Sequence, residues 1–91
     1  MLLTNVKAHS AKPASKPIKL PDGGGLYLEV RPGGAKLWRY RYRIDAKENV
    51  FAIGEYYADK RAGHVSIEAA RRARDEAREL VRKGIHPAHR R

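Results

Sequence analysis

The sequence contains no cysteine, a single tryptophan, methionine and phenylalanine, and only ten acidic residues among 91. The absence of cysteine excludes disulfide bonds and thiolate metal sites. No apolar run approaches the ~18–20 residues that a helix needs to cross a bilayer, and residues 1–7 lack the long apolar core of a signal peptide. A chain of 91 residues with these features is expected to be a single cytoplasmic domain without a membrane partner.

Basic residues, by contrast, are abundant. Twenty lysines and arginines against ten acidic residues give a formal net charge of +10. An excess of this size favours a polyanionic partner and says little about the fold. The four histidines are scattered, and no carboxylates are paired as a catalytic site would need. We therefore expect no enzymatic activity, no cofactor and no metal site.

The stretch from Leu37 to Ile44 alternates strictly between two kinds of side chain. One side of an extended chain would carry the aromatic residues Trp38, Tyr40 and Tyr42, and the other side would carry Arg39, Arg41 and Arg43. A period of two is the signature of a half-buried strand. The aromatic row can seed a core. The guanidinium groups would lie roughly 6.5–7 Å apart, a row that suits a repeating anion such as a phosphate backbone.

Two further alternating segments flank this strand. Residues 26–31 precede it across Pro32 to Ala35, which is a strong hairpin signal. Residues 50–54 follow a turn at 45–49. The three segments predict an antiparallel meander of three strands.

The N-terminal part is less regular. Thr4 to Ala11 could form a short helix with Thr4 as its cap. Residues 12–17 form an extended basic arm, which is either a frayed terminus or a segment that lies on a phosphate backbone. Residues 18–20 could add a short strand. The glycine-rich residues 21–25 are expected to form a structural turn, because no Gly-Lys-Ser/Thr follows as in a phosphate loop.

An amphipathic helix is predicted from Ser66, a good N-cap, to Lys83, before Gly84 and Pro87. Its apolar half is mostly alanine, and only Arg74 falls on the wrong side of the helical wheel. Such a helix can approach the aromatic face of the sheet closely, which gives a two-layer α+β domain over residues 1–85. Residues 86–91 are expected to begin a linker, since two histidines spaced three apart are not enough for a metal site.

The charge concentrates on the strands. Residues 31–43 hold five basic residues and no acidic one, whereas residues 66–83 hold six basic and four acidic residues. The helix charges form favourable pairs along its surface, and only Glu29 offers a counter-charge on the arginine face. The sheet is narrow enough to enter the major groove of DNA. The candidate nucleic-acid-binding residues are Tyr27, Arg31, Lys36, Arg39, Arg41 and Arg43.

The chain resembles the N-terminal arm-type DNA-binding domains of P4-like tyrosine recombinases, which are the integrases of phages and genomic islands. The segments that carry the resemblance are residues 19–30 (KLPDGGGLYLEV), 36–43 (KLWRYRYR), 53–56 (IGEY), 66–71 (SIEAAR) and 84–87 (GIHP). The resemblance implies a three-stranded sheet packed on a C-terminal helix. It also implies binding to arm sites on duplex DNA, with the sheet in the major groove, alongside other integrase protomers.

Two departures from the family pattern stand out. Tyr57 replaces a proline, and residues 58–65 form a longer loop than usual. The arginines, lysine, His-x-x-Arg motif and tyrosine nucleophile of the recombinase do not occur as a set in this chain, so we expect no strand transfer by it and a monomeric isolated domain. Two other functions remain open, a protein-interaction module of an integrase and a free-standing regulator that stacks RNA bases on Tyr27.

Overall fold

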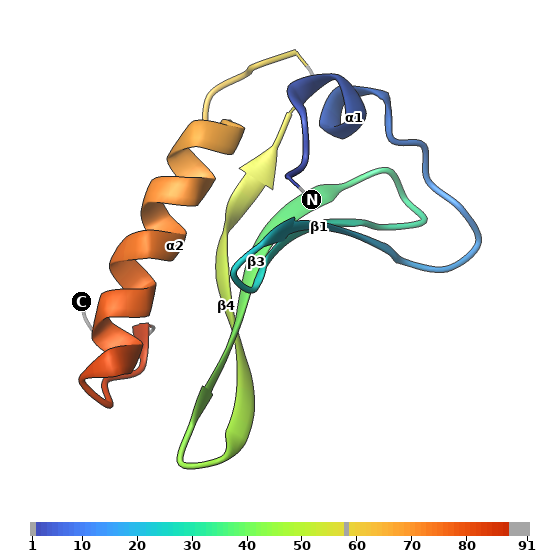
Figure 1. Ribbon diagram of the computed structural model, residues 1–91. Helices are drawn as coiled ribbons and strands as arrows, with labels where there is room; N and C mark the ends of the chain where they lie inside the picture. The colour runs from blue at the N-terminus through green and yellow to red at the C-terminus, as the bar shows by residue number, and fades with distance from the viewer. Residues whose placement is uncertain (1, 58, 88–91) are drawn as a thin grey trace.

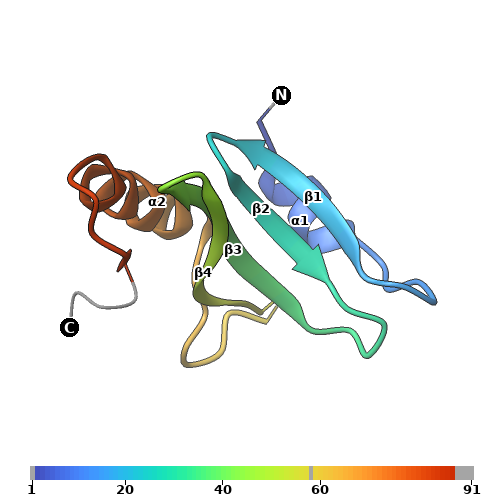
Figure 2. The ribbon, with the colours of Figure 1, turned by 90° about the horizontal axis from the view of Figure 1, so that it is seen from below.

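The computed structural model describes residues 2–57 and 59–87. It contains one four-stranded antiparallel sheet, with the strands side by side in chain order, and two helices (Figure 2). The elements are α1 (Asn5–Ser10), β1 (Ile18–Gly23), β2 (Leu26–Val30), β3 (Lys36–Ile44), β4 (Lys47–Tyr56) and α2 (Ile67–Arg82). The α+β class and the C-terminal helix are confirmed, whereas the prediction of three strands is wrong. No helix in the described part of the chain is long and apolar enough to cross a membrane.

The additional strand is β1, which pairs with β2 from Ile18 to Gly23. Proline and glycine at positions 21 and 23 led us to expect a turn there. Proline lacks an amide donor, but it is tolerated in an edge strand such as β1, which has a neighbouring strand on one side only. The register shifts between Pro21 and Gly23, so the strand accommodates the irregular residues through a bulge.

The β3–β4 turn is shorter than expected. Asp45 and Ala46 both adopt positive φ, 52° and 64°, as in a two-residue hairpin turn. Residues 47–49, which we assigned to the turn, therefore belong to β4. Pairing between β2 and β3 ends at Tyr40, so residues 41–50, called the ribbon below, extend beyond β2 as a two-stranded hairpin (Figure 1).

The aromatic row of β3 faces the helices, as predicted. Trp38 is fully buried with Leu28 of β2, Ala8 of α1 and Ala70 of α2. Tyr40 and, within the ribbon, Tyr42 pack on Ala77 of α2. The alanines let α2 lie close to the rings, which fixes the ribbon against a rigid support.

The loop before α2 closes over Trp38. The indole Nε1 donates a hydrogen bond to the Val65 carbonyl oxygen at 2.8 Å. Gly54 permits this approach, because a Cβ at that position would lie 2.6 Å from Cγ2 of Val65. Real side chains do not pack this tightly, so the close contact requires glycine.

The ends of α2 follow the sequence signals. Ser66 accepts a hydrogen bond from the Ala69 amide at 3.1 Å. At the other end Gly84 has a φ of 77°, and the amides of Gly84 and Ile85 donate to Val81 and Leu80, which is a Schellman motif.

The chain then returns to the sheet. His86 Nδ1 lies 2.9 Å from the Tyr42 hydroxyl, and Pro87 is buried. The first two residues of the expected linker thus pack on the domain, and its remaining residues, 88–91, lie outside the described part of the chain.

Arg74, the exception on the helical wheel, has a defined partner. Its Nη1 donates to the Gly23 carbonyl oxygen at 2.9 Å, and its side chain is only 15% exposed. Arg74 faces the β1–β2 turn. Its guanidinium group contacts the backbone oxygen there and lies 3.6 Å from the buried carboxylate of Asp22.

Candidate nucleic-acid interface

The sheet face that points away from both helices, called the outer face below, carries the three arginines of β3. The strand register places Tyr27 opposite Arg39 and Glu48 opposite Arg43. The arginine row therefore runs from the middle of the sheet to the end of the ribbon, on the side opposite the aromatic core.

Exposure of the arginine side chains rises toward the ribbon. Arg39 is 23% exposed, Arg41 43% and Arg43 73%. Arg39 Nε is buried and makes no hydrogen bond within the described residues, although the Glu29 carboxylate lies 3.5 Å away. Arg41 and Arg43 thus offer their guanidinium groups to an external anion, whereas Arg39 is largely committed to the sheet.

Glu29 and Glu48 are the carboxylates that approach the arginines on the outer face. Glu29 bonds Arg31 at 2.9 Å as well as approaching Arg39. Glu48 lies 4.0 Å from both Arg41 and Arg43. One exposed carboxylate cannot neutralise two guanidinium groups, and exposed pairs contribute only about 0–1 kcal/mol. The ribbon therefore keeps an excess of positive charge.

The sequence analysis did not identify Glu48 as a residue of the arginine face. We placed it in a turn, and Glu29 was then the only acidic residue expected near the arginines. Once the turn is reduced to Asp45 and Ala46, Glu48 falls opposite Arg43 on the outer face. The sequence did not indicate this pairing, because a two-residue hairpin turn of this type usually contains glycine and the Asp-Ala turn has none.

Tyr27 is covered on the outer face by cations. Lys19 Nζ lies 5.5 Å from the ring centroid and the Arg41 guanidinium carbon 5.3 Å. The residue is only 6% exposed. Its ring supports Arg41 by a cation–π contact and offers little free surface on which a base could stack.

Lys36 lies apart from the arginines. It shares the inner face with Trp38, and its Nζ donates to the carbonyl oxygens of Ala8 and His9 at 2.7 and 2.9 Å. Burial lowers the pKa of Lys36. The lysine therefore closes the C-terminal end of α1. Arg31, by contrast, is exposed beside Glu29 at the end of β2.

The backbone of Arg41 is held where β2 ends. Its amide donates to the Gly25 carbonyl oxygen at 2.8 Å. Gly25 has a φ of 89°, and a Cβ there would overlap the Arg41 carbonyl oxygen. The glycine turn therefore fixes the root of the ribbon, which is a structural role, as predicted for this segment.

The long loop after β4 is braced at its two ends. The Tyr57 amide donates to His64 Nδ1 at 3.0 Å, and the Val65 amide donates to the Glu55 carbonyl oxygen at 2.8 Å. Arg61 stacks on the Tyr57 ring and binds Asp59. The hydrogen bond from Arg61 lowers the pKa of the Asp59 carboxyl, so the charges of this loop are mostly paired with each other.

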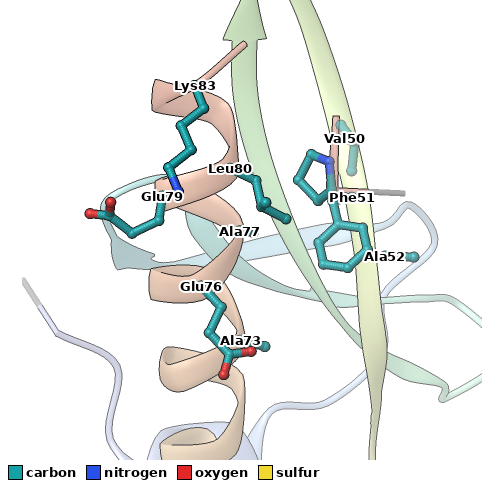
Figure 3. A pocket seen from close by; sticks show the side chains of 10 residues that line it. Val50, Phe51, Ala52, Ala73, Glu76, Ala77, Glu79, Leu80 and Lys83 are labelled. Atoms are coloured by element: carbon teal, nitrogen blue, oxygen red, sulfur yellow. The ribbon is translucent and has the colours of Figure 1, made fainter. Parts of the chain in front are cut away.

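A groove of about 920 Å³ lies on the other side of the ribbon, between β4 and α2 (Figure 3). Phe51, Ala73, Ala77 and Leu80 line it, with Glu76, Glu79 and Lys83 beside them. Its walls are mainly apolar, and two of its three charged side chains are acidic. The groove therefore suits a polyanion less well than the arginine row of the outer face does.

Comparisons with known proteins give the family of this chain. The family pattern described as an arm DNA-binding domain matches residues 3–91. The integrase of Enterobacteria phage P4 is 43% identical over 89 residues, which cover 96% of this chain and 19% of that protein. The integrase of Shigella phage Sf6 and the prophage integrase IntS of Escherichia coli K12 are each 38% identical over 86 residues, 94% of this chain and 21% of each relative.

The chain thus spans about a fifth of the length of these relatives. The matches cover the sheet, both helices and the ribbon, so they extend over the whole fold described above. The chain belongs to the family of N-terminal arm DNA-binding domains of phage and prophage integrases.

Proposed function

We propose that this domain binds arm-type sites in duplex DNA through the ribbon, with the outer face of β3 and β4 in the major groove. In this position it would place an integrase and its DNA for integration or excision of a mobile element, while strand cleavage belongs to other parts of the parent protein. Other integrase protomers would occupy neighbouring arm sites.

The observation that carries the proposal is the row of Arg41 and Arg43 on a protruding two-stranded hairpin. The major groove of B-DNA admits a two-stranded ribbon, and arginine can bind guanine O6 and N7 or grip phosphate bidentately. α2 covers the opposite face of the same strands, so the ribbon can enter a groove without exposing the core.

The proposal is tested by Arg41→Ala, measured by fluorescence anisotropy on duplex DNA from the ends of the host element. We expect affinity to fall about tenfold, as for loss of one good bidentate contact, with thermal unfolding nearly unchanged because the side chain is exposed. Arg72→Ala, on the exposed surface of α2, removes the same charge away from the ribbon and serves as the control. Equal affinities for wild type and Arg41→Ala would reject the ribbon as the binding surface.

Salt dependence gives a second measure. If about four to six phosphates are neutralised, log affinity should fall against log salt with a slope of roughly −4 to −5. Competition with single-stranded RNA tests the alternative of an RNA-binding regulator. The covered ring of Tyr27 favours duplex DNA, and preferential binding of RNA would overturn that choice.

A further inference from the structure

We infer that Glu48 forms a specificity subsite of the ribbon that accepts a hydrogen bond from the exocyclic amino group of a DNA base, with cytosine N4 as the preferred donor. The inference rests on the proposed binding of the ribbon in the major groove. It adds an acidic residue to a binding surface that the proposed function assigns to arginines.

The first argument is the free hydrogen-bonding capacity of the carboxylate. Glu48 lies 4.0 Å from both Arg41 and Arg43, which is beyond hydrogen-bond distance. Its side chain is 53% exposed, and no hydrogen bond reaches it from the described residues. Both carboxylate oxygens can therefore accept from an external donor, whereas Glu29 is 13% exposed and already bonded to Arg31.

The second argument is electrostatic. A carboxylate on a surface that met only phosphates would weaken binding by like-charge repulsion. Glu48 stands opposite Arg43 in the register, at the most exposed end of the arginine row. A position there is compatible with duplex binding when the carboxylate faces base edges, where cytosine presents an amino donor in the major groove.

The third argument is spacing. Arg41 and Arg43 are two residues apart on one strand, which corresponds to roughly 6.5–7 Å. This distance matches about two base-pair steps at 3.4 Å each. Two arginines that read guanine and one carboxylate that reads an amino group would therefore recognise base pairs within about two steps of one another. The 4.0 Å separations let Glu48 orient both guanidinium groups without consuming their donors.

The experiment selects bound duplexes from a randomised DNA library and sequences them for wild type, Glu48→Ala, Glu48→Gln and Glu79→Gln. Glu79 pairs with Arg82 at the surface of α2, so Glu79→Gln makes the same change in charge on a different element, away from the outer face. For wild type we expect guanine and, within about two base pairs of it, cytosine as the preferred bases.

Glu48→Ala should lose the cytosine preference by about tenfold while keeping the guanine preference and binding non-specific duplex at least as tightly as wild type. Glu48→Gln should move the same position toward adenine, which glutamine can bind at N6 and N7. Selection of adenine at that position by wild type would assign the amino donor to adenine N6 and overturn the preference for cytosine. Thermal unfolding of each variant should match wild type, because Glu48 makes no buried contact.

Identical selected sequences for wild type and Glu48→Ala would overturn the subsite while leaving the proposed function intact. An equal effect of Glu79→Gln would also overturn it, because the change would then reflect net charge alone. Failure of wild type to bind any duplex would overturn the proposed function itself.

Discussion

Asp22 and Arg71 form an ion pair that joins β1 to α2, in which the carboxylate is buried and the Arg71 side chain is 29% exposed. The Asp22 carboxylate has no exposed surface and accepts hydrogen bonds from Nε and Nη2 of Arg71 at 3.0 and 2.8 Å. It also accepts from the Leu3 amide at 2.8 Å, and Arg71 Nη2 donates to the Leu3 carbonyl oxygen at 2.8 Å. One carboxylate thus fastens the N-terminal segment, an edge strand and the helix that supports the ribbon.

We predict that Asp22→Ala destabilises the domain by up to about 3–5 kcal/mol, the loss expected when one partner of a fully buried pair is removed. The variant would leave the Arg71 guanidinium and the Leu3 amide without their acceptor. Urea unfolding measures the loss. Asp75→Ala is the control, because the Asp75 side chain is 64% exposed; it should change stability by less than about 1 kcal/mol. Equal effects of the two variants would refute the role of Asp22.

The same carboxylate makes stability depend on pH. Burial opposes ionisation of Asp22, but the hydrogen bonds from Arg71 and Leu3 and the charges of Arg71 and Arg74 outweigh it and lower the pKa of Asp22. The unfolded chain, with an ordinary pKa of about 3.9, then binds protons before the folded chain does. The stabilisation is fully present above that pH and is lost as the pH falls through the lowered folded pKa.

We therefore expect wild type to lose stability more steeply below about pH 4 than Asp22→Asn, which cannot titrate at this position. Urea unfolding between pH 2 and 7 measures the two curves. Parallel curves would show that Asp22 does not contribute to acid sensitivity.

Sequence reasoning reached the fold class through strong periodic signals. Alternation in residues 37–44 predicted both faces of β3, and Ser66 and Gly84 marked α2 closely. Pro21 and Asp22 gave no strand signal, because an edge position and a buried partner decide their conformation. Lys36 lies two residues before Trp38, and this spacing places both side chains on the inner face of the strand. We nevertheless assigned Lys36 to the arginine face, because the segment around it is strongly basic.

A variant of Lys36 can distinguish a charge that stabilises the fold from a charge that contacts DNA. Lys36→Met should destabilise the attachment of α1, because the carbonyl oxygens of Ala8 and His9 lose their donor. Each lost hydrogen bond to a charged group corresponds to about 1.5–3 kcal/mol. DNA affinity and its salt slope should stay close to wild type in the folded variant.

Arg43→Met is the matched comparison for that measurement. It also removes one positive charge, but from a side chain that is 73% exposed on the ribbon. The slope of log affinity against log salt should become less steep by about one for this variant. A decrease of the same size for Lys36→Met would assign Lys36 to the DNA interface after all.

Trp38→Ala should have the reverse effect of Arg41→Ala, with loss of stability and no direct loss of a DNA contact. Trp38 is fully buried at the centre of the larger core cluster, and its indole holds the loop before α2 through Val65. Removing a buried tryptophan side chain costs about 3–5 kcal/mol, a large share of the roughly 5–15 kcal/mol available to a small domain. The midpoint temperature of thermal unfolding should shift strongly downward.

DNA affinity of Trp38→Ala, measured at a temperature where the variant is folded, should remain near that of wild type, because the residue lies on the face opposite Arg39, Arg41 and Arg43. A variant that stays stable but loses DNA affinity would place the binding surface on the inner face.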